Sequence, residues 1–348
     1  MPSRPTPSRS RPIRIGFLPL TDAAPLIIAK SRGLFARRGV AVELKREVGW
    51  ATIREKIRLG ELDAAQAPAP MLWAMELGLG CPPCPVLTAF ILNENGNALT
   101  LARSLGPDAY DSAGLRKIAH SKRGGQPLTI GSVFPFSSHN LMIREWLRRS
   151  GLVHEKDVRT VIVPPAQMYR NLVAGTIDGY AAGEPWNSLA VSDNVGWCPL
   201  WSAAIGGPQV EKVLLVTQKF AEARPAEHAA VIASLGESAA WCDKRESRGP
   251  LAALLSAPEN VDLPERLIAP PLLGQFDAGR VSLEPVPDFH IFHKDGANRP
   301  SESKATALQA ALQAAGIIPS KLGPGIARRL FREDLYSHYV ETDGPMNG

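Results

Sequence analysis

Short apolar segments alternate with amphipathic ones twice along this chain. The first series holds strand-like residues 13–20, 40–44 and 62–67, and the second holds residues 128–133, 158–163 and 176–182. Between them lie amphipathic segments that end at glycines such as Gly33 and Gly60, which is typical of helices. Thr21 or Asp22 is the candidate cap of the helix that ends at Gly33, with Pro25 in its first turn. Strands that alternate with helices in this way predict an α/β fold with parallel sheets flanked by helices.

The two series predict two similarly built lobes. Residues 57–67 and 172–182 both combine a helix end, a glycine and an acid-bearing strand, although such joints are common in α/β proteins. A segment rich in Gly, Pro, Ser and charge separates the series. We expect the tail to return to the first lobe, so that the chain crosses twice and a cleft opens between the lobes. The predicted division is a disordered basic arm at 1–12, a discontinuous first lobe at 13–103 and 205–348, and a second lobe at 104–204.

The charge is concentrated at the start of the chain. Arg4, Arg9, Arg11 and Arg14 account for most of the formal net charge of +5, so the body of the protein is nearly neutral. We interpret the Pro/Ser-rich arm as a solvated leader, with contact to RNA or anionic lipid as the alternative, and we expect no direct binding of nucleic acid. The arm lacks the apolar core of a secretory signal, which favours the cytoplasm. The apolar residues 23–29 are too few to span a membrane.

Neither metal chemistry nor catalysis is favoured by the sequence. Cys81 and Cys84 form one C-x-x-C pair with no second pair after it, so we expect a proline-stiffened loop and no metal or cofactor. The segment GEPWNS begins with Gly183 at the end of a strand. There Glu184 and Pro185 suit the first turn of a helix, and no nucleophile, second carboxylate or Ser-His-Asp set accompanies Glu184. We therefore expect a protein that is not an enzyme.

Several segments in a fixed order resemble one family. They are residues 15–35, Trp50 with residues 60–65, and residues 93–101, 136–140, 163–168, 179–187 and 211–215. Together they are similar to the nitrate- and bicarbonate-binding proteins of ABC transporters, and the likeness covers residues 13–290. The resemblance implies a two-lobed type II periplasmic-binding-protein fold. Without an export signal, the chain looks like the cytoplasmic nitrate/nitrite sensors that control an RNA-binding, ANTAR-type antitermination partner. The alternative is the solute-binding subunit of a nitrate transporter.

Carried onto this chain, the family's anion-contacting residues are Trp50, Asn97, His139 and Lys212. Nitrate is planar, singly charged and has no proton to donate, so its site needs donors and a compensating cation. Lys212 supplies the charge, and the indole, imidazole and amide groups supply N–H donors. By default, each residue also has a simpler interpretation: Trp50 as a core residue, His139 as a capping or surface residue, and Lys212 as half of an exposed pair with Glu211.

Two features bear on which anion is bound. Many nitrate-binding members carry Gln where this chain has Asn97, so the shorter side chain leaves nitrate and nitrite both open. A bicarbonate-binding member is expected to replace the lysine with an acid and to recruit a metal, so Lys212 argues against bicarbonate. The fold also includes enzymes, but the reactive His or Cys clusters that they need are not apparent. We expect anion binding to favour a closed form, and Lys212→Ala to abolish the response while leaving the fold intact.

Overall fold

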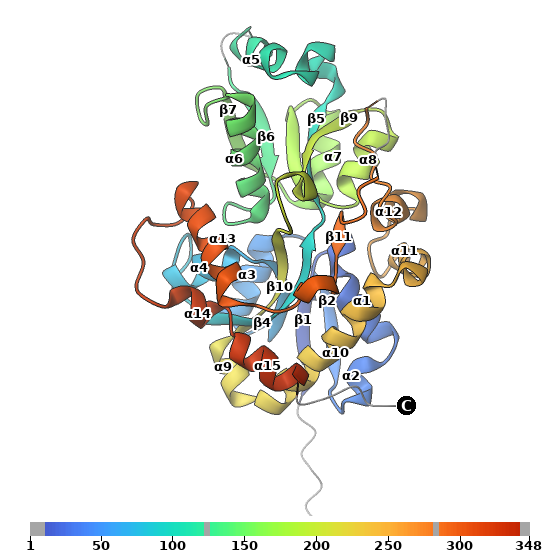
Figure 1. Ribbon diagram of the computed structural model, residues 1–348, viewed down its shortest axis with the longest axis vertical. Helices are drawn as coiled ribbons and strands as arrows, with labels where there is room; N and C mark the ends of the chain where they lie inside the picture. The colour runs from blue at the N-terminus through green and yellow to red at the C-terminus, as the bar shows by residue number, and fades with distance from the viewer. Residues whose placement is uncertain (1–10, 122–125, 281–284, 342–348) are drawn as a thin grey trace, which may run out of the picture.

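A computed structural model describes residues 11–121, 126–280 and 285–341. The molecule has two lobes stacked along its longest axis (Figure 1), each built around one sheet. The first sheet has the strand order β11-β4-β10-β3-β1-β2, and the second has the order β7-β6-β8-β5-β9. The expected two-lobed α/β fold is therefore confirmed. Both sheets are mixed, because β10 pairs antiparallel with β3 and β4, and β5 pairs antiparallel with β8 and β9.

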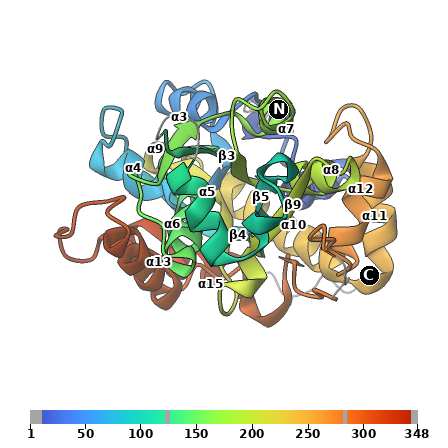
Figure 2. The same ribbon diagram turned by 90° about the horizontal axis from the view of Figure 1, so that it is seen from above.

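The first sheet contains β1 (Ile13–Phe17), β2 (Val42–Arg46), β3 (Ala64–Pro68), β4 (Val86–Asn95), β10 (Val210–Thr217) and β11 (His290–Ile291). Its helices include α1 (Ala24–Ser31), α2 (Leu34–Arg37), α3 (Trp50–Arg58), α4 (Met71–Leu77), α9 (Gln218–Ala223), α10 (Pro225–Asp243) and α11 (Arg248–Leu255). They continue with α12 (Glu265–Leu272), α13 (Glu302–Ala314), α14 (Ile326–Leu330) and α15 (Glu333–Glu341). Seen from above, α13 lies on the opposite side of the molecule from α11 and α12 (Figure 2).

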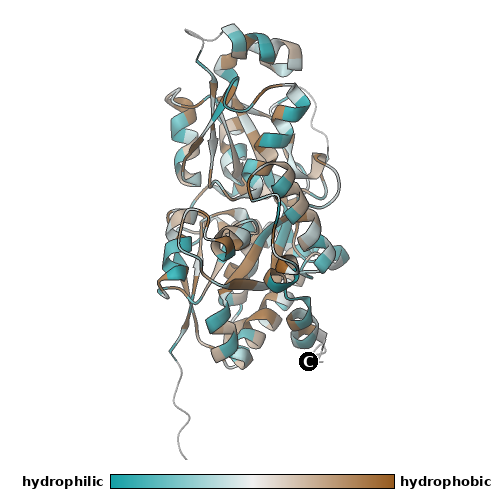
Figure 3. Cartoon of the chain, turned by 90° about the vertical axis from the view of Figure 1, so that its left-hand side faces the viewer, coloured by the Kyte–Doolittle hydropathy of each residue, from teal (hydrophilic) through white to brown (hydrophobic). Residues whose placement is uncertain are grey.

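The second sheet contains β5 (Asn97–Ala102), β6 (Leu128–Ser132), β7 (Val158–Ile162), β8 (Gly179–Gly183) and β9 (Gly196–Trp201). Four helices accompany it: α5 (Ser112–Ser121), α6 (Ser138–Ser150), α7 (Pro165–Val173) and α8 (Trp186–Ser192). Hydrophobic residues, shown in brown, lie mainly inside both lobes, and hydrophilic residues, shown in teal, are frequent on the outer helices (Figure 3). This is the pattern expected of helices that each bury one face against a sheet.

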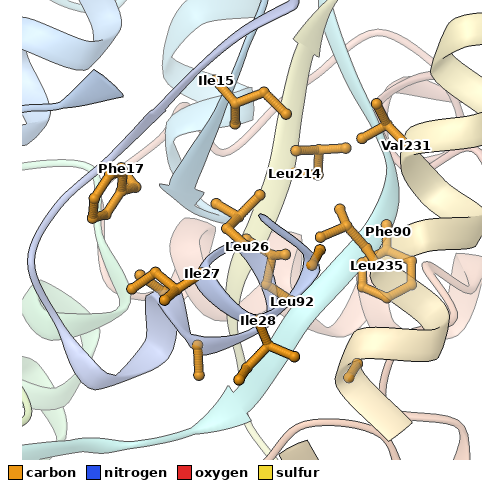
Figure 4. Close-up of a cluster of buried hydrophobic side chains, with 14 of the residues drawn as sticks. Ile15, Phe17, Leu26, Ile27, Ile28, Phe90, Leu92, Leu214, Val231 and Leu235 are labelled. Atoms are coloured by element: carbon orange, nitrogen blue, oxygen red, sulfur yellow. The ribbon is translucent and has the colours of Figure 1, made fainter. Parts of the chain in front are cut away.

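Helix α1 packs against the first sheet and α10. Leu26 and Ile28 of α1 lie beside Leu92 of β4, Leu214 of β10 and Leu235 of α10 (Figure 4). All five side chains are at most 1% exposed. Burying a side chain of this size contributes about 1.5–3 kcal/mol, so this cluster fixes the sheet whose central strand carries Lys212.

The lobes share buried contacts as well as two chain crossings. One hydrophobic cluster joins Leu20 and Trp50 of the first lobe to Phe134 and Met168 of the second. The crossings lie side by side, because the Asn95 N–H donates to the Gln209 carbonyl at 2.8 Å. Gly96 has a φ of +96°, and a Cβ there would lie 2.4 Å from His290 Nδ1, so only glycine fits this crossing.

Four sequence-based expectations need correction. Residues up to 103 were assigned to the first lobe, but β5 pairs within the second sheet, so sheet membership changes at Gly96. The basic arm was expected to continue to residue 12, yet Arg11 donates to Asp63 at 2.6 Å and 2.7 Å; residues 1–10 lie outside the described residues. Asp22 was a candidate helix cap, but its carboxylate contacts other side chains. The simpler interpretation of Lys212 and Glu211 as an exposed pair is wrong, because both are buried.

One local expectation, the placement of Glu184, agrees with the structure. Glu184 follows the end of β8, and its Oε2 accepts a hydrogen bond from the Ser188 N–H at 3.1 Å, which places it at the start of α8 as expected. Cys81 and Cys84 carry free thiols in the described chain. Within the described ranges, none of the helices combines the length and apolar character that crossing a membrane requires.

Candidate functional site

Lys212 lies on the central strand β10, between β3 and β4, with none of its side chain exposed. Its ammonium group lies 2.8 Å from Asp22 Oδ2 and also contacts Glu211 Oε1. Side chains of consecutive strand residues normally point to opposite faces, but the pairing of β10 with β4 shifts register on both sides of Lys212. This irregularity explains how Glu211 and Lys212 make contact with each other.

Trp50 is the first residue of α3 and is 1% exposed. The Lys212 ammonium lies 5.4 Å from the centroid of its indole ring, within cation–π range. The indole Nε1 is buried, and no described residue accepts its hydrogen bond. A buried donor without an acceptor costs free energy in the ligand-free protein. Trp50 therefore presents both an apolar face and a free N–H next to the buried cation.

His139 lies in the first turn of α6, where Ser137 caps the helix by accepting from the Asn140 N–H. Its ring is fully buried, and both ring nitrogens are without hydrogen-bond partners among the residues described. His139 Nε2 lies 3.9 Å from Glu211 Oε1. Burial lowers the pKa of His139 to about 3, so the imidazole is neutral at physiological pH and donates through only one nitrogen.

Asn97 begins β5 and pairs with Gly183 of β8. Asn97 Oδ1 is buried, and in the described chain it accepts no hydrogen bond. A Cβ at Gly183 would lie 3.4 Å from Asn97 Oδ1 and 3.3 Å from Asp22 Oδ2. Asn97 Oδ1 and Asp22 Oδ2 therefore both border the space next to Gly183.

All four residues predicted from the sequence lie at the boundary between the lobes. Trp50 lies near Lys212, His139 approaches Glu211, and Asn97 borders the space next to Gly183 that Asp22 also borders. Whether they bind an anion stays a prediction. A cleft of about 790 Å³, lined by parts of α6, α13 and the loop before β10, reaches Asn97 and Glu211.

The sequence-based prediction missed Asp22, Glu211 and Gln66. Asp22 Oδ1 accepts from Gln66 Nε2, and Gln66 Oε1 accepts from the Leu18 N–H at 2.9 Å. Asp22 is thus held in place by a neighbour from β3. Its position next to a helix start and a proline suggested a cap, and no local pattern showed that it faces a lysine on a distant strand.

The buried charges do not balance. Asp22 and Glu211 are two carboxylates around one ammonium, and the neutral His139 adds no charge. Burial and the neighbouring Glu211 carboxylate together raise the pKa of Asp22 by more than Lys212 lowers it. Burial also raises the pKa of Glu211, but Lys212 and His139 outweigh this effect and the net pKa is lowered. For Lys212, burial lowers the pKa, and the two carboxylates raise it by more.

The sequence matches the NMT1-like family over residues 6–256. This chain belongs to that family. It is 35% identical over 326 residues to the nitrate import ATP-binding protein NrtC of Synechocystis, a match covering 92% of this chain and 49% of NrtC. It is 33% identical over 310 residues to the bicarbonate transport ATP-binding protein CmpC of Synechococcus elongatus, covering 88% and 46%.

Binding proteins are also similar to this chain. The nitrate/nitrite binding protein NrtA of Nostoc is 32% identical over 252 residues, covering 70% of this chain and 56% of NrtA. The chain spans about half the length of the curated relatives it matches. The crystal structure of the periplasmic nitrate-binding protein NrtA of Synechocystis superimposes with a TM-score of 0.89 at 26% identity, covering 95% of this chain and 88% of that one.

The likeness extends to other binding proteins at the level of the fold alone. The alkanesulfonate-binding protein SsuA of Xanthomonas axonopodis has a TM-score of 0.66 at 19% identity. The expected homology to nitrate-binding proteins is confirmed by NrtA, which is named for binding nitrate and nitrite. The narrower expectation of a cytoplasmic sensor stays a prediction.

Proposed function

We propose that the protein binds nitrate or nitrite between its lobes, as the anion-binding part of an import system. The observation that carries the proposal is the group of buried donors around Lys212. Trp50 Nε1 and both ring nitrogens of His139 have no partner within the described chain, although buried polar groups nearly always have one. A small ligand with several acceptor oxygens would satisfy the Trp50 N–H and the one N–H that the neutral His139 ring carries.

Nitrate suits these donors by its shape and chemistry. Its three oxygens lie in one plane and accept hydrogen bonds, so Trp50 Nε1, one His139 N–H and the Asn97 amide can each donate to it. Lys212 supplies positive charge close to the Trp50 ring. The similarity to NrtA over most of both chains supports nitrate or nitrite as the ligand.

Two other assignments have weaker support. Because some relatives are named for bicarbonate transport, bicarbonate is a competing ligand. The family resemblance implies that a bicarbonate-binding member carries an acid and a metal where this chain has Lys212, and this disfavours bicarbonate. The expectation that the protein releases an ANTAR-type antitermination partner in the cytoplasm also stays a prediction. The names of the similar proteins point to import, so we favour the import role.

The test is a calorimetric titration of the purified full-length chain with nitrate, nitrite, bicarbonate and sulfate. We expect saturable one-site binding of nitrate or nitrite and none of sulfate, whose second charge the single ammonium of Lys212 does not compensate. Binding of bicarbonate alone would replace the proposed ligand. The absence of heat with all four anions, confirmed by an unchanged melting temperature, would overturn the proposal.

A further inference from the structure

The buried cluster around Lys212 already carries a surplus negative charge before any anion arrives. Lys212, Asp22 and Glu211 are each at most 1% exposed, and the ammonium contacts both carboxylates. This inference rests on the proposed function, because it concerns how the same site accepts an anion. A monoanion beside Lys212 would add a second surplus negative charge in a region from which water is excluded. Buried charges without compensation are strongly unfavourable, so a compensating positive charge must enter with the anion.

We propose that the protein binds its anion together with one proton, which Asp22 takes up from solvent. The Asp22 carboxylate and a solvent proton become a neutral carboxylic acid, protonated at Oδ2. The net charge of the buried cluster with the anion bound then equals its net charge without the anion. In this state the Asp22 hydroxyl donates a hydrogen bond, and Lys212 is released from Asp22 to face the anion.

The geometry favours Asp22 over Glu211 as the proton acceptor. Asp22 Oδ1 already accepts a hydrogen bond from Gln66 Nε2. Asp22 Oδ2 faces Lys212 and, like Asn97 Oδ1, borders the space next to Gly183. Glu211 Oε1 contacts Lys212 and has a second polar neighbour, His139 Nε2, at 3.9 Å. Consistent with this, burial raises the pKa of Asp22 while that of Glu211 is lowered on balance by Lys212 and His139. Asp22 is therefore the weaker acid of the two.

Other titratable groups near Asp22 are alternative sites for the proton. His139 of α6 and His290 of β11 both have pKa values lowered by burial, so they are neutral. Glu184, after β8, accepts from the Thr21 N–H through its backbone carbonyl at 3.0 Å, and burial raises the pKa of its carboxyl to about 7. Its Oε2 accepts from the Ser188 N–H, which holds the carboxyl at the start of α8. Glu184 is thus the rival acceptor that the experiment has to exclude.

The experiment is calorimetry with potassium nitrate in pairs of buffers that differ in ionisation enthalpy, from about pH 5 to about pH 9. The difference in heat between paired buffers counts the protons taken up. We expect about one proton where the pH lies between the pKa values of Asp22 without and with the anion. Across that window the Kd for nitrate should rise by up to about tenfold per pH unit, and it should be constant on either side.

Three variants test which carboxylate takes up the proton when nitrate binds. Asp22→Asn should bind nitrate without proton uptake and with a Kd independent of pH. Glu184→Gln should retain the uptake. Asp63→Asn, which alters another buried, paired carboxylate of the first lobe, is the matched control and should also retain it.

Two outcomes would overturn the inference while leaving the proposed function intact. One is nitrate binding by the wild-type protein without proton uptake at any pH, a result that needs no variant and so stands even where Asp22→Asn fails to fold. The other is uptake that persists in Asp22→Asn and disappears in Glu184→Gln. Absence of nitrate binding throughout the pH range would instead overturn the proposed function, and the inference with it.

Discussion

His139 Nε2 lies 3.9 Å from Glu211 Oε1, too far for a hydrogen bond. The ring is fully buried, and its nitrogens lack partners in the part of the chain that the structure describes. The ligand-free protein therefore keeps an unsatisfied imidazole at the boundary of its lobes, at a cost of about 1–3 kcal/mol for each unpaired group.

Replacement of His139 by leucine should therefore weaken nitrate binding without lowering the stability of the ligand-free protein. We expect His139→Leu to keep or raise the free energy of unfolding in urea without nitrate, because an apolar side chain of similar size replaces unpaired polar atoms. Nitrate affinity should fall by at least about tenfold, since one donor is lost. A variant that binds nitrate as the wild type does would show that His139 does not contact the anion.

Lys212 should contribute to stability as well as to binding. The sequence suggested that Lys212→Ala leaves the fold intact, but the structure shows that this change would leave Asp22 and Glu211 buried without their counter-ion. We expect Lys212→Ala to lose about 3–5 kcal/mol of unfolding free energy near neutral pH. The double variant Asp22→Asn/Lys212→Ala should recover part of that loss. Chemical denaturation of both proteins tests this, and an unaltered stability of Lys212→Ala would contradict the buried ion pairs.

Gly183 should control access to the site without controlling the fold. An added methyl group there would lie within 3.4 Å of both Asn97 Oδ1 and Asp22 Oδ2, which is tighter than a normal contact. We expect Gly183→Ala to melt near the wild-type temperature and to bind nitrate at least about tenfold more weakly. Gly249→Ala is the control, because a Cβ at Gly249 meets no described atom within 4 Å. Equal nitrate affinity in both variants would place the ligand elsewhere.

Glu184 should make stability depend on pH. Its pKa is raised by burial from the ordinary value of 4.5 to about 7 in the folded protein. The folded state therefore holds the proton more tightly, so its contribution to stability is complete below pH 4.5 and is lost as the pH rises through 7. A shift of this size corresponds to roughly 3 kcal/mol. Unfolding free energies should be measured from pH 4.5 to 8. The stability of Glu184→Gln relative to the wild type should increase by an amount of this order as the pH rises across that range. Parallel pH profiles for the two proteins would exclude this role.

Local sequence patterns predicted the α/β elements, because hydrophobic periodicity and glycine stops are local signals. They did not predict the burial of Glu211 and Lys212. The strand that carries them, β10, is inserted between β3 and β4, which come from a much earlier part of the chain. For the same reason Asp22 looked like a helix cap, although its partner lies on β10. Trp50, Asn97, His139 and Lys212 came from a family resemblance, and the charge balance around them became visible only in three dimensions.

The most direct test of the account compares nitrate binding by the wild type and by Trp50→Phe. This change keeps an aromatic ring near Lys212 and removes the N–H that lacks an acceptor in the described chain. We predict one-site nitrate binding by the wild type, at least about tenfold weaker binding by Trp50→Phe, and similar melting temperatures without nitrate. Equal nitrate affinity in the two proteins, or no saturable binding by the wild type, would contradict the proposal that this buried cluster is the anion site.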